Sequence, residues 1–182
     1  NNVAAVVTER DANWWSLRRQ SLQCNELEKG YFNSGVLLIN TLAWAQESVS
    51  AKAMSMLADK AIVSRLTYMD QDILNLILLG KVKFIDAKYN TQFSLNYELK
   101  KSFVCPINDE TVLIHYVGPT KPWHYWAGYP SAQPFIKAKE ASPWKNEPLM
   151  RPVNSNYARY CAKHNFKQNK PCRNNLDQRA FR

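Results

Sequence analysis

The fold class follows from the stretch Tyr31-Phe32-Asn33-Ser34-Gly35-Val36-Leu37-Leu38-Ile39-Asn40. Its apolar run, Val36–Ile39, is continuous, which is typical of a strand that is covered on both faces of its sheet. Thr41 follows as a candidate helix N-cap, and apolar residues then recur at helical spacing to about Ala58. A small polar corner, 33–35, stands directly before the predicted strand. The stretch therefore predicts a strand followed by a helix, with a polar entrance to the strand.

Similar patterns alternate along the first 120 residues. We expect short strands at 3–7, 82–85 and 112–114, and helices at 13–22 and 70–79, the second ending at Gly80. Strands that alternate with helices predict an α/β fold, with helices packed on a sheet. After Trp123 the chain is rich in Pro, Gly and aromatic residues, and we expect a short helix at about 131–141.

The composition indicates a folded protein. With 182 residues, of which 46% are hydrophobic, the chain can bury a sizeable core, and it forms one domain or part of a larger one. No apolar run approaches the length of a membrane helix. The four cysteines contain no C-x-x-C pair, so reduced thiols are expected, with disulfides and zinc left open. Because the chain opens at Asn1 with a strand already under way, we expect a fragment.

The positive charge is concentrated near the C-terminus. The whole chain carries a net charge of +9, and residues 144–182 contain nine Lys and Arg against Glu147 and Asp177, a net charge of +7. Such a segment favours an anionic partner. Tyr157, Tyr160, Cys161 and His164 share one face of a predicted helix beside a basic stripe. This helix either lies on an anionic membrane surface or packs on the domain with a solvated charged face.

Two further motifs contain residues that are able to do chemistry. The first is Asp70-Gln71-Asp72-Ile73-Leu74-Asn75. Either Asp70 caps the helix and Asp72 stabilises its first turn, or Asp70 and Gln71 project into a sugar-binding cleft. The second is Ile114-His115-Tyr116-Val117-Gly118-Pro119-Thr120-Lys121-Pro122-Trp123. A histidine and a lysine across a glycine turn are suited to a metal-bound phosphate, although a half-buried histidine beside an ordinary turn gives the same pattern.

Several classes of protein are not supported by the sequence. It lacks G-x-S-x-G, H-E-x-x-H, the P-loop and G-x-G-x-x-G, which argues against serine hydrolases, zincins and nucleotide-dependent dehydrogenases. No RNP-like or zinc-knuckle pattern appears, so nucleic acid is not a predicted partner.

The three motifs, in this order and with Tyr89-Asn90 between the last two, resemble glycosyltransferase family 8. Within that family the chain is most similar to the bacterial lipopolysaccharide core hexosyltransferases, which use UDP-glucose or UDP-galactose. The resemblance implies the C-terminal part of a GT-A-like mixed sheet flanked by helices. It assigns 1–130 to the C-terminal portion of the catalytic domain and 131–182 to a basic, partly helical C-terminal extension.

The resemblance also implies roles for individual residues. His115 is expected to ligate Mn²⁺ or Mg²⁺ at the UDP diphosphate, with Gly118 and Lys121 at the phosphates. Asn33, Ser34 and Gly35 are expected to line the donor-sugar pocket, and Asp70 and Gln71 are expected to hold the sugar near its anomeric carbon. Asp70 and Gln71 are also the candidate catalytic residues. The implied reaction retains anomeric configuration, and front-face attack by the acceptor hydroxyl is favoured because the amide oxygen of Gln71 is a weak nucleophile.

One family feature has no counterpart in this sequence. The family needs an Asp-x-Asp motif for its metal, and the only D-x-D here, Asp70 to Asp72, matches the later motif. We therefore expect the missing motif before Asn1, and a chain that is inactive alone. The implied protein acts on the lipopolysaccharide core at the inner face of the inner membrane, as a cytoplasmic peripheral enzyme. The alternative is a non-catalytic module that binds carbohydrate or polyanions.

Overall fold

The computed structural model describes residues 2–9, 12–99 and 104–167. The chain divides into two compact units. Unit 1 comprises Asn1–Thr91 and Thr111–His115, and unit 2 comprises Gln92–Glu110 and Tyr116–Arg182. The family motif at 114–123 therefore contributes His115 to unit 1 and the residues after it to unit 2.

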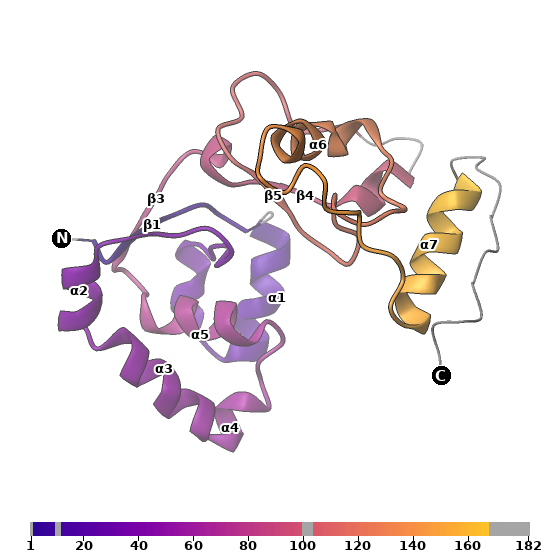
Figure 1. The fold of residues 1–182 in the computed structure, drawn as a ribbon. Coiled ribbons are helices and arrows are strands. Elements are labelled where there is room, and N and C mark those ends of the chain that lie inside the picture. The colour runs from indigo at the N-terminus through magenta and orange to yellow at the C-terminus, as the bar shows by residue number, and fades with distance from the viewer. Residues whose placement is uncertain (1, 10–11, 100–103, 168–182) are drawn as a thin grey trace. The chain divides into compact units, whose positions relative to one another are not determined.

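Unit 1 is built on a three-stranded mixed sheet (Figure 1). Its strands are β1 (Ala4–Val6), β2 (Leu38–Ile39) and β3 (Val82–Phe84), in the order β2-β1-β3. Strand β1 pairs antiparallel with β2 and parallel with β3. A parallel pair needs a long crossover connection, and helices supply it between β2 and β3. The expected α/β class with a mixed sheet is thus confirmed.

The described part of unit 1 contains five α-helices. They are α1 (Ala12–Leu22), α2 (Thr41–Gln46), α3 (Val49–Ala58), α4 (Lys60–Val63) and α5 (Met69–Ile77), and single-turn 3-10 helices lie at Asn25–Lys29 and Ala87–Asn90. Of the five, α2, α3 and α5 pack against the sheet. One core cluster joins β1 to α3 through Val6, Phe32 and Val49, with Leu74 of α5 packed against it. A second cluster surrounds Tyr31 and includes tryptophans of α1. Helices α3 and α5 therefore share a core with the sheet.

The helix predicted from Thr41 to about Ala58 is interrupted. Helix α2 ends where Ser48 adopts a left-handed conformation, with φ 51°, and α3 begins at the next residue. The N-cap of α2 is Asn40, not Thr41, because the Asn40 side chain accepts a hydrogen bond from the backbone N–H of Ala43. Helices are present on both sides of a break that the apolar spacing does not reveal, and of the stripe Leu42 remains 68% exposed.

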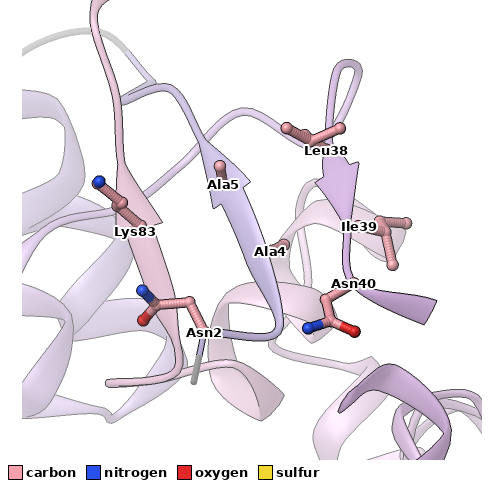
Figure 2. A pocket seen from close by; sticks show the side chains of 7 residues that line it. All are labelled: Asn2, Ala4, Ala5, Leu38, Ile39, Asn40 and Lys83. Carbon is pink, nitrogen blue, oxygen red and sulfur yellow. The ribbon is translucent and has the colours of Figure 1, made fainter. Parts of the chain in front are cut away.

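The prediction of a strand buried on both faces at Val36–Ile39 is wrong. Strand β2 contains only Leu38 and Ile39, lies at the edge of the sheet, and leaves Leu38 72% exposed. A shallow pocket runs across the three strands here (Figure 2). It is lined by Asn2, Ala4, Ala5, Leu38, Ile39, Asn40 and Lys83, none of which is a predicted site residue.

A second sheet pairs β4 (Thr91–Phe93) with β5 (Ile114–Tyr116), and the division between the units passes through both strands. The strand expected at 112–114 thus begins two residues later and contains His115. Unit 2 continues with α6 (Gln133–Glu140) and α7 (Ser155–Lys167), and with 3-10 helices at Leu95–Leu99 and Pro130–Ala132. Its core includes Phe93 and Tyr129.

Helix α7 packs on unit 2 by its aromatic face. His164 is fully buried, and the Tyr157 ring lies 5.2 Å from that of His124 and 5.7 Å from that of Trp126. Its basic residues Arg159, Lys163 and Lys167 are exposed. Of the two interpretations of this helix, the structure supports packing on the domain with a solvated charged face. Lys170 lies outside the described residues.

Candidate functional site

The centre of unit 1 is a polar seam between α5 and the segment 31–34. The Asn75 side chain connects the two by a pair of hydrogen bonds to the Phe32 backbone. Its amide accepts from the Phe32 N–H at 2.8 Å and donates to the Phe32 carbonyl at 2.9 Å. One turn earlier, Asp72 Oδ1 accepts from the Tyr31 hydroxyl at 2.6 Å. The second predicted motif is therefore attached, residue by residue, to the first.

Asp72 is an anchor of this seam and not a helix cap in the expected sense. It is fully buried, and its Oδ2 accepts the backbone N–H groups of Thr67 and Tyr68 at 2.7 and 2.8 Å. The N-cap of α5 is Tyr68, so Asp70 occupies the first turn. Burial, and then the hydrogen bond to Asp72, raise the pKa of Tyr31 well above its ordinary value, which keeps the phenol protonated as the donor.

Asp70 and Gln71 both reach Ser34. The Ser34 hydroxyl donates to Asp70 Oδ2 at 2.9 Å, and the Ser34 N–H donates to Gln71 Oε1 at 3.0 Å. Gln71 is 8% exposed, whereas Asp70 is exposed. The amide oxygen of Gln71 is thus engaged by backbone, and the carboxylate of Asp70 is the more accessible of the two groups.

Asn33 is connected to three parts of unit 1. Its Nδ2 donates to Glu9 Oε2 at 2.6 Å, and its Oδ1 accepts from the Gly35 N–H at 3.0 Å and from Asn90 Nδ2 at 3.1 Å. These are three of the four hydrogen bonds that a carboxamide can make. Glu9 Oε2 also accepts from Gln71 Nε2 at 3.5 Å. The network therefore links the predicted donor-site residues through a carboxylate.

His115 completes the network. Its Nδ1 lies 3.0 Å from Asn90 Oδ1, and its ring lies directly against Gly35. A Cβ added at Gly35 would stand 2.1 Å from His115 Cε1, which no side chain could tolerate. The structure brings into one network six residues that were predicted for one site from three separate motifs. They are Asn33, Ser34, Gly35, Asp70, Gln71 and His115.

Gly118 and Lys121, predicted for the phosphates, belong to unit 2. Gly118 has φ 79°, and a Cβ there would lie 2.7 Å from Ser94 Oγ, so both its backbone and its neighbour favour glycine. The Lys121 ammonium group donates to the Tyr116 carbonyl. Partial burial lowers the pKa of Lys121.

Two residues of the network were not among the predicted site residues. Glu9 follows the first predicted strand in a polar stretch, and Asn90 belongs to the family pattern but was given no role in the site. Both follow the adjacent parallel strands, Glu9 after β1 and Asn90 after β3. Because the carboxyl ends of parallel strands meet at one edge of a sheet, where α/β proteins bind ligands, this position is the signal that could have found them.

Within the described part of the chain, no group of three or more His, Cys, Asp and Glu is arranged to hold a metal ion. His115 fits the role of a single ligand, since the orientation of its imidazole is set by Asn90. The described residues thus offer one metal ligand at this place and not a complete set.

Helices long and apolar enough to cross a membrane are absent from residues 2–9, 12–99 and 104–167.

Comparison with known proteins gives consistent matches. The lipopolysaccharide glucosyltransferase WaaO of Escherichia coli K12 is 55% identical over 171 residues, which cover 93% of this chain and 50% of that protein. A lipopolysaccharide 1,3-galactosyltransferase of Salmonella typhimurium is 52% identical over 168 residues, which cover 92% and 50%. The chain therefore spans about half the length of the curated relatives it matches.

The fold has solved counterparts. The galactosyltransferase LgtC, crystallised with donor and acceptor sugar analogues, is similar with a TM-score of 0.58 and 22% identity, covering 86% of this chain and 55% of that one. The α/β architecture is thus that of GT-A-like glycosyltransferases. The model of glycosyl transferase family 8 matches residues 1–127, and that of its C-terminal region matches residues 129–174. The chain belongs to glycosyltransferase family 8.

Proposed function

We propose that this chain is part of a retaining hexosyltransferase that moves glucose or galactose from a UDP-sugar to a lipopolysaccharide core. The observation that carries the proposal is the polar network of unit 1, which joins the three family motifs. The relatives that are 55% and 52% identical are a lipopolysaccharide glucosyltransferase and a galactosyltransferase. The donor is therefore one of these two hexoses, and the acceptor is an anionic core oligosaccharide.

The donor sugar would be held by hydrogen bonds from the exposed side of the network. Asp70 is the accessible carboxylate, and Ser34 holds it in place. Gln71 is engaged by the Ser34 N–H, which makes its amide oxygen a poorer nucleophile still. Front-face attack by the acceptor hydroxyl, with Asp70 and Gln71 fixing the sugar near its anomeric carbon, is the mechanism we favour.

Charge develops on the departing diphosphate, and cationic groups stabilise it there. His115 would hold Mn²⁺ or Mg²⁺ as one ligand, and the ion would offset this charge when bound. Lys121 and the backbone at Gly118 would contact the phosphates. We further propose that the remaining metal ligands are the carboxylates of a second Asp-x-Asp motif, since the only one in these 182 residues is Asp70 to Asp72.

A transfer assay tests the proposal. A protein that contains both this chain and an Asp-x-Asp half should transfer radiolabelled glucose or galactose to a lipopolysaccharide core in the presence of Mn²⁺. The 182-residue chain alone should not turn over either UDP-hexose, because one histidine binds a hard cation weakly. Absence of transfer by the complete protein would refute the function, and robust turnover by the chain alone would refute only the split of the site.

The alternative, a non-catalytic binder of carbohydrate or polyanions, predicts a different titration. Its binding would rest on charge, so UDP affinity would fall with salt and would be indifferent to Mn²⁺. The hexosyltransferase predicts UDP binding that Mn²⁺ strengthens and that His115→Ala weakens.

We propose that the protein associates peripherally with the anionic inner face of the inner membrane through the basic face of α7. The aromatic face of that helix is packed on unit 2, so the attraction would be purely electrostatic. Replacing Arg159, Lys163 and Lys167 by Gln should weaken binding to phosphatidylglycerol vesicles at low salt by about two orders of magnitude.

A second triple variant controls for net charge. Lys60, Lys83 and Lys137 are also exposed and lie outside α7. Their replacement by Gln removes the same charge and should change vesicle binding far less. Equal losses in the two variants would show that total charge, and not the α7 face, governs association.

A further inference from the structure

We infer that Asn90 is a positioning residue, which sets the position of the proton on the His115 ring, and that Asn33 sets the direction of the Asn90 amide. The chain of hydrogen bonds runs from Glu9 to Asn33, from Asn33 to Asn90, and from Asn90 to the imidazole. The tautomer of the His115 ring can be measured in the 182-residue protein without a metal ion. Its consequence for metal binding rests on the proposed function.

The direction of the first amide is fixed by groups that have no choice of role. The Gly35 N–H can only donate, so the Asn33 atom 3.0 Å from it is the amide oxygen. The Glu9 carboxylate oxygen accepts on the other side, at 2.6 Å, so the atom facing it is the amide nitrogen. A reversed Asn33 would place its NH₂ group against the Gly35 N–H and its carbonyl oxygen against the Glu9 carboxylate.

The second amide inherits its direction from the first. Since Asn33 presents its oxygen, Asn90 must present its nitrogen to it, which places Asn90 Oδ1 toward the imidazole. An amide oxygen only accepts, so the proton of the 3.0 Å contact belongs to His115 Nδ1. A neutral imidazole carries one N–H, and its Nε2 is therefore the nitrogen with the lone pair.

Burial makes this arrangement hard to reverse. Asn90 is 1% exposed, Asn33 5% and Glu9 6%, so water has little access to replace a lost partner. Reversing one amide would leave mismatched groups at both of its ends in a low-dielectric setting, where each mismatch is costly. Gly35 lies against the ring and limits its rotation. Proton position and ring orientation are thus set together.

The chemical consequence concerns affinity for a divalent cation. A histidine that ligates a metal usually donates its other N–H to a fixed acceptor, which holds the ligating nitrogen deprotonated and aimed. Here that acceptor is Asn90, whose direction is set by Asn33. Asn90 thus supports the proposed metal ligand without touching the ion.

The tautomer is measured directly in the metal-free chain. The protein contains three histidines, so ¹⁵N-histidine labelling gives three rings, and the variant His115→Gln assigns the one of interest. At about pH 8, where an ordinary imidazole is neutral, long-range ¹H–¹⁵N correlations distinguish the two tautomers. We expect the Nδ1–H form for His115. The Nε2–H form would overturn the inference.

A matched pair of variants tests Asn90 itself. Asn90→Asp keeps an oxygen that accepts from His115 Nδ1, and we expect it to leave the ring in the Nδ1–H form. Asn90→Ala removes the acceptor, and we expect a mixture of the two tautomers. Any other combination overturns the role of Asn90. If Asn90→Ala does not fold, Asn90→Leu removes the same acceptor at similar size and should give the same mixture. Glu9→Gln is the control and should keep the Nδ1–H form, because the Gly35 N–H still fixes the Asn33 amide.

The effect on binding separates this inference from the proposed function. In a protein that also carries the Asp-x-Asp half, Asn90→Ala should weaken Mn²⁺ binding by about tenfold to a hundredfold, with Glu9→Gln close to the wild type. If no variant binds Mn²⁺ while the tautomers behave as expected, the proposed function fails and the positioning role of Asn90 stands.

Discussion

Each unit contains a buried polar cluster with a histidine, and the two clusters differ in kind. In unit 1, His115 is half-buried and faces a network of amides and carboxylates. In unit 2, His164 is fully buried, with its Nε2 3.1 Å from Thr120 Oγ1 and 2.8 Å from Asn96 Oδ1, and the Tyr129 ring 5.1 Å away. The first cluster reaches an exposed carboxylate at Asp70, and the second is enclosed by aromatic side chains.

This difference separates two uses of one sequence motif. The residues 114–123 contribute His115 to the polar network of unit 1 and Thr120 to the aromatic cluster of unit 2. In unit 2, His124 stacks on Trp126 with ring centroids 4.2 Å apart, and burial, followed by the charge of Lys121, lowers its pKa. Thr120 and His124 thus contact α7 and hold it on unit 2, whereas His115 is the proposed metal ligand. A family motif can hold both kinds of residue within ten positions.

The largest effect is expected from Asp72, the buried carboxylate of unit 1. Asp72→Ala leaves the Tyr31 hydroxyl and the N–H groups of Thr67 and Tyr68 without their acceptor. Unsatisfied buried donors are costly, and we expect a loss of about 4 kcal/mol in the free energy of unfolding of unit 1. Urea unfolding followed by circular dichroism measures it.

Asp59→Ala is the matched control for this change. Asp59 also accepts backbone N–H groups, as the N-cap of α4, but it is exposed. Its loss should cost about 1 kcal/mol. If the two variants lose similar amounts, the seam between α5 and residues 31–34 does not depend on Asp72, and the comparison between the clusters weakens.

The next effect concerns His164, which the fold of unit 2 buries in its neutral form. Burial is the main cause that lowers its pKa from 6.5 to about 4, with the nearby Lys163 and His124 adding to it. Below about pH 6.5 the unfolded chain binds a proton that the folded chain refuses, so the stability of unit 2 falls as the pH is lowered toward 4. The accumulated loss is about 3 kcal/mol.

Removing the titrating group isolates this contribution. His164→Gln keeps a polar side chain that can reach Thr120 or Asn96, and it lacks the titration. Urea unfolding of both proteins at several pH values between about 7.5 and 4.5 should show the wild type losing more stability than the variant as the solution becomes acidic. Parallel curves would show that His164 is not buried in its neutral form.

Local patterns predicted part of this structure and could not predict the rest. Helical spacing correctly marked Tyr157 and His164 as one face of a helix, but it says nothing of Thr120 and Asn96, which are 44 and 68 residues away in the chain. Periodicity identifies the face that will be buried and not its partner. The interruption at Ser48 was missed for a related reason, because a left-handed serine leaves the apolar spacing on both sides unchanged.

The members of the unit 1 network that stand in the three motifs could be named from the sequence, and the residues that support them could not. Asn33, Gln71 and His115 each belong to one of these compact motifs, so they could be named together. Glu9 and Asn90 each follow a strand. Both reach Asn33 because β1 and β3 are parallel neighbours, which places the ends of these strands at one edge of the sheet. That pairing is a tertiary fact, which a polar residue after a strand suggests but does not specify.

The smallest effect tests the contact that most directly defines the cluster of unit 1. Gly35→Ala would place Cβ 2.1 Å from His115 Cε1 and 2.7 Å from Nε2, so the ring must move away from Asn90 or the backbone must shift. We expect a loss of about 2 kcal/mol in the free energy of unfolding, typical of overpacking. Ser55→Ala is the control, because it introduces an alanine at an exposed position of α3, and it should be nearly neutral.

A double-mutant cycle makes this prediction specific to the imidazole. In a His115→Ala background the clash is gone, so Gly35→Ala should cost much less than it does in the wild type, and the two substitutions should couple by 1 kcal/mol or more, roughly. Additive losses would mean that Gly35 is required by its own backbone and not by the ring. Because the φ of Gly35 lies outside the left-handed range, the structure favours the first outcome and assigns the glycine to the histidine it faces.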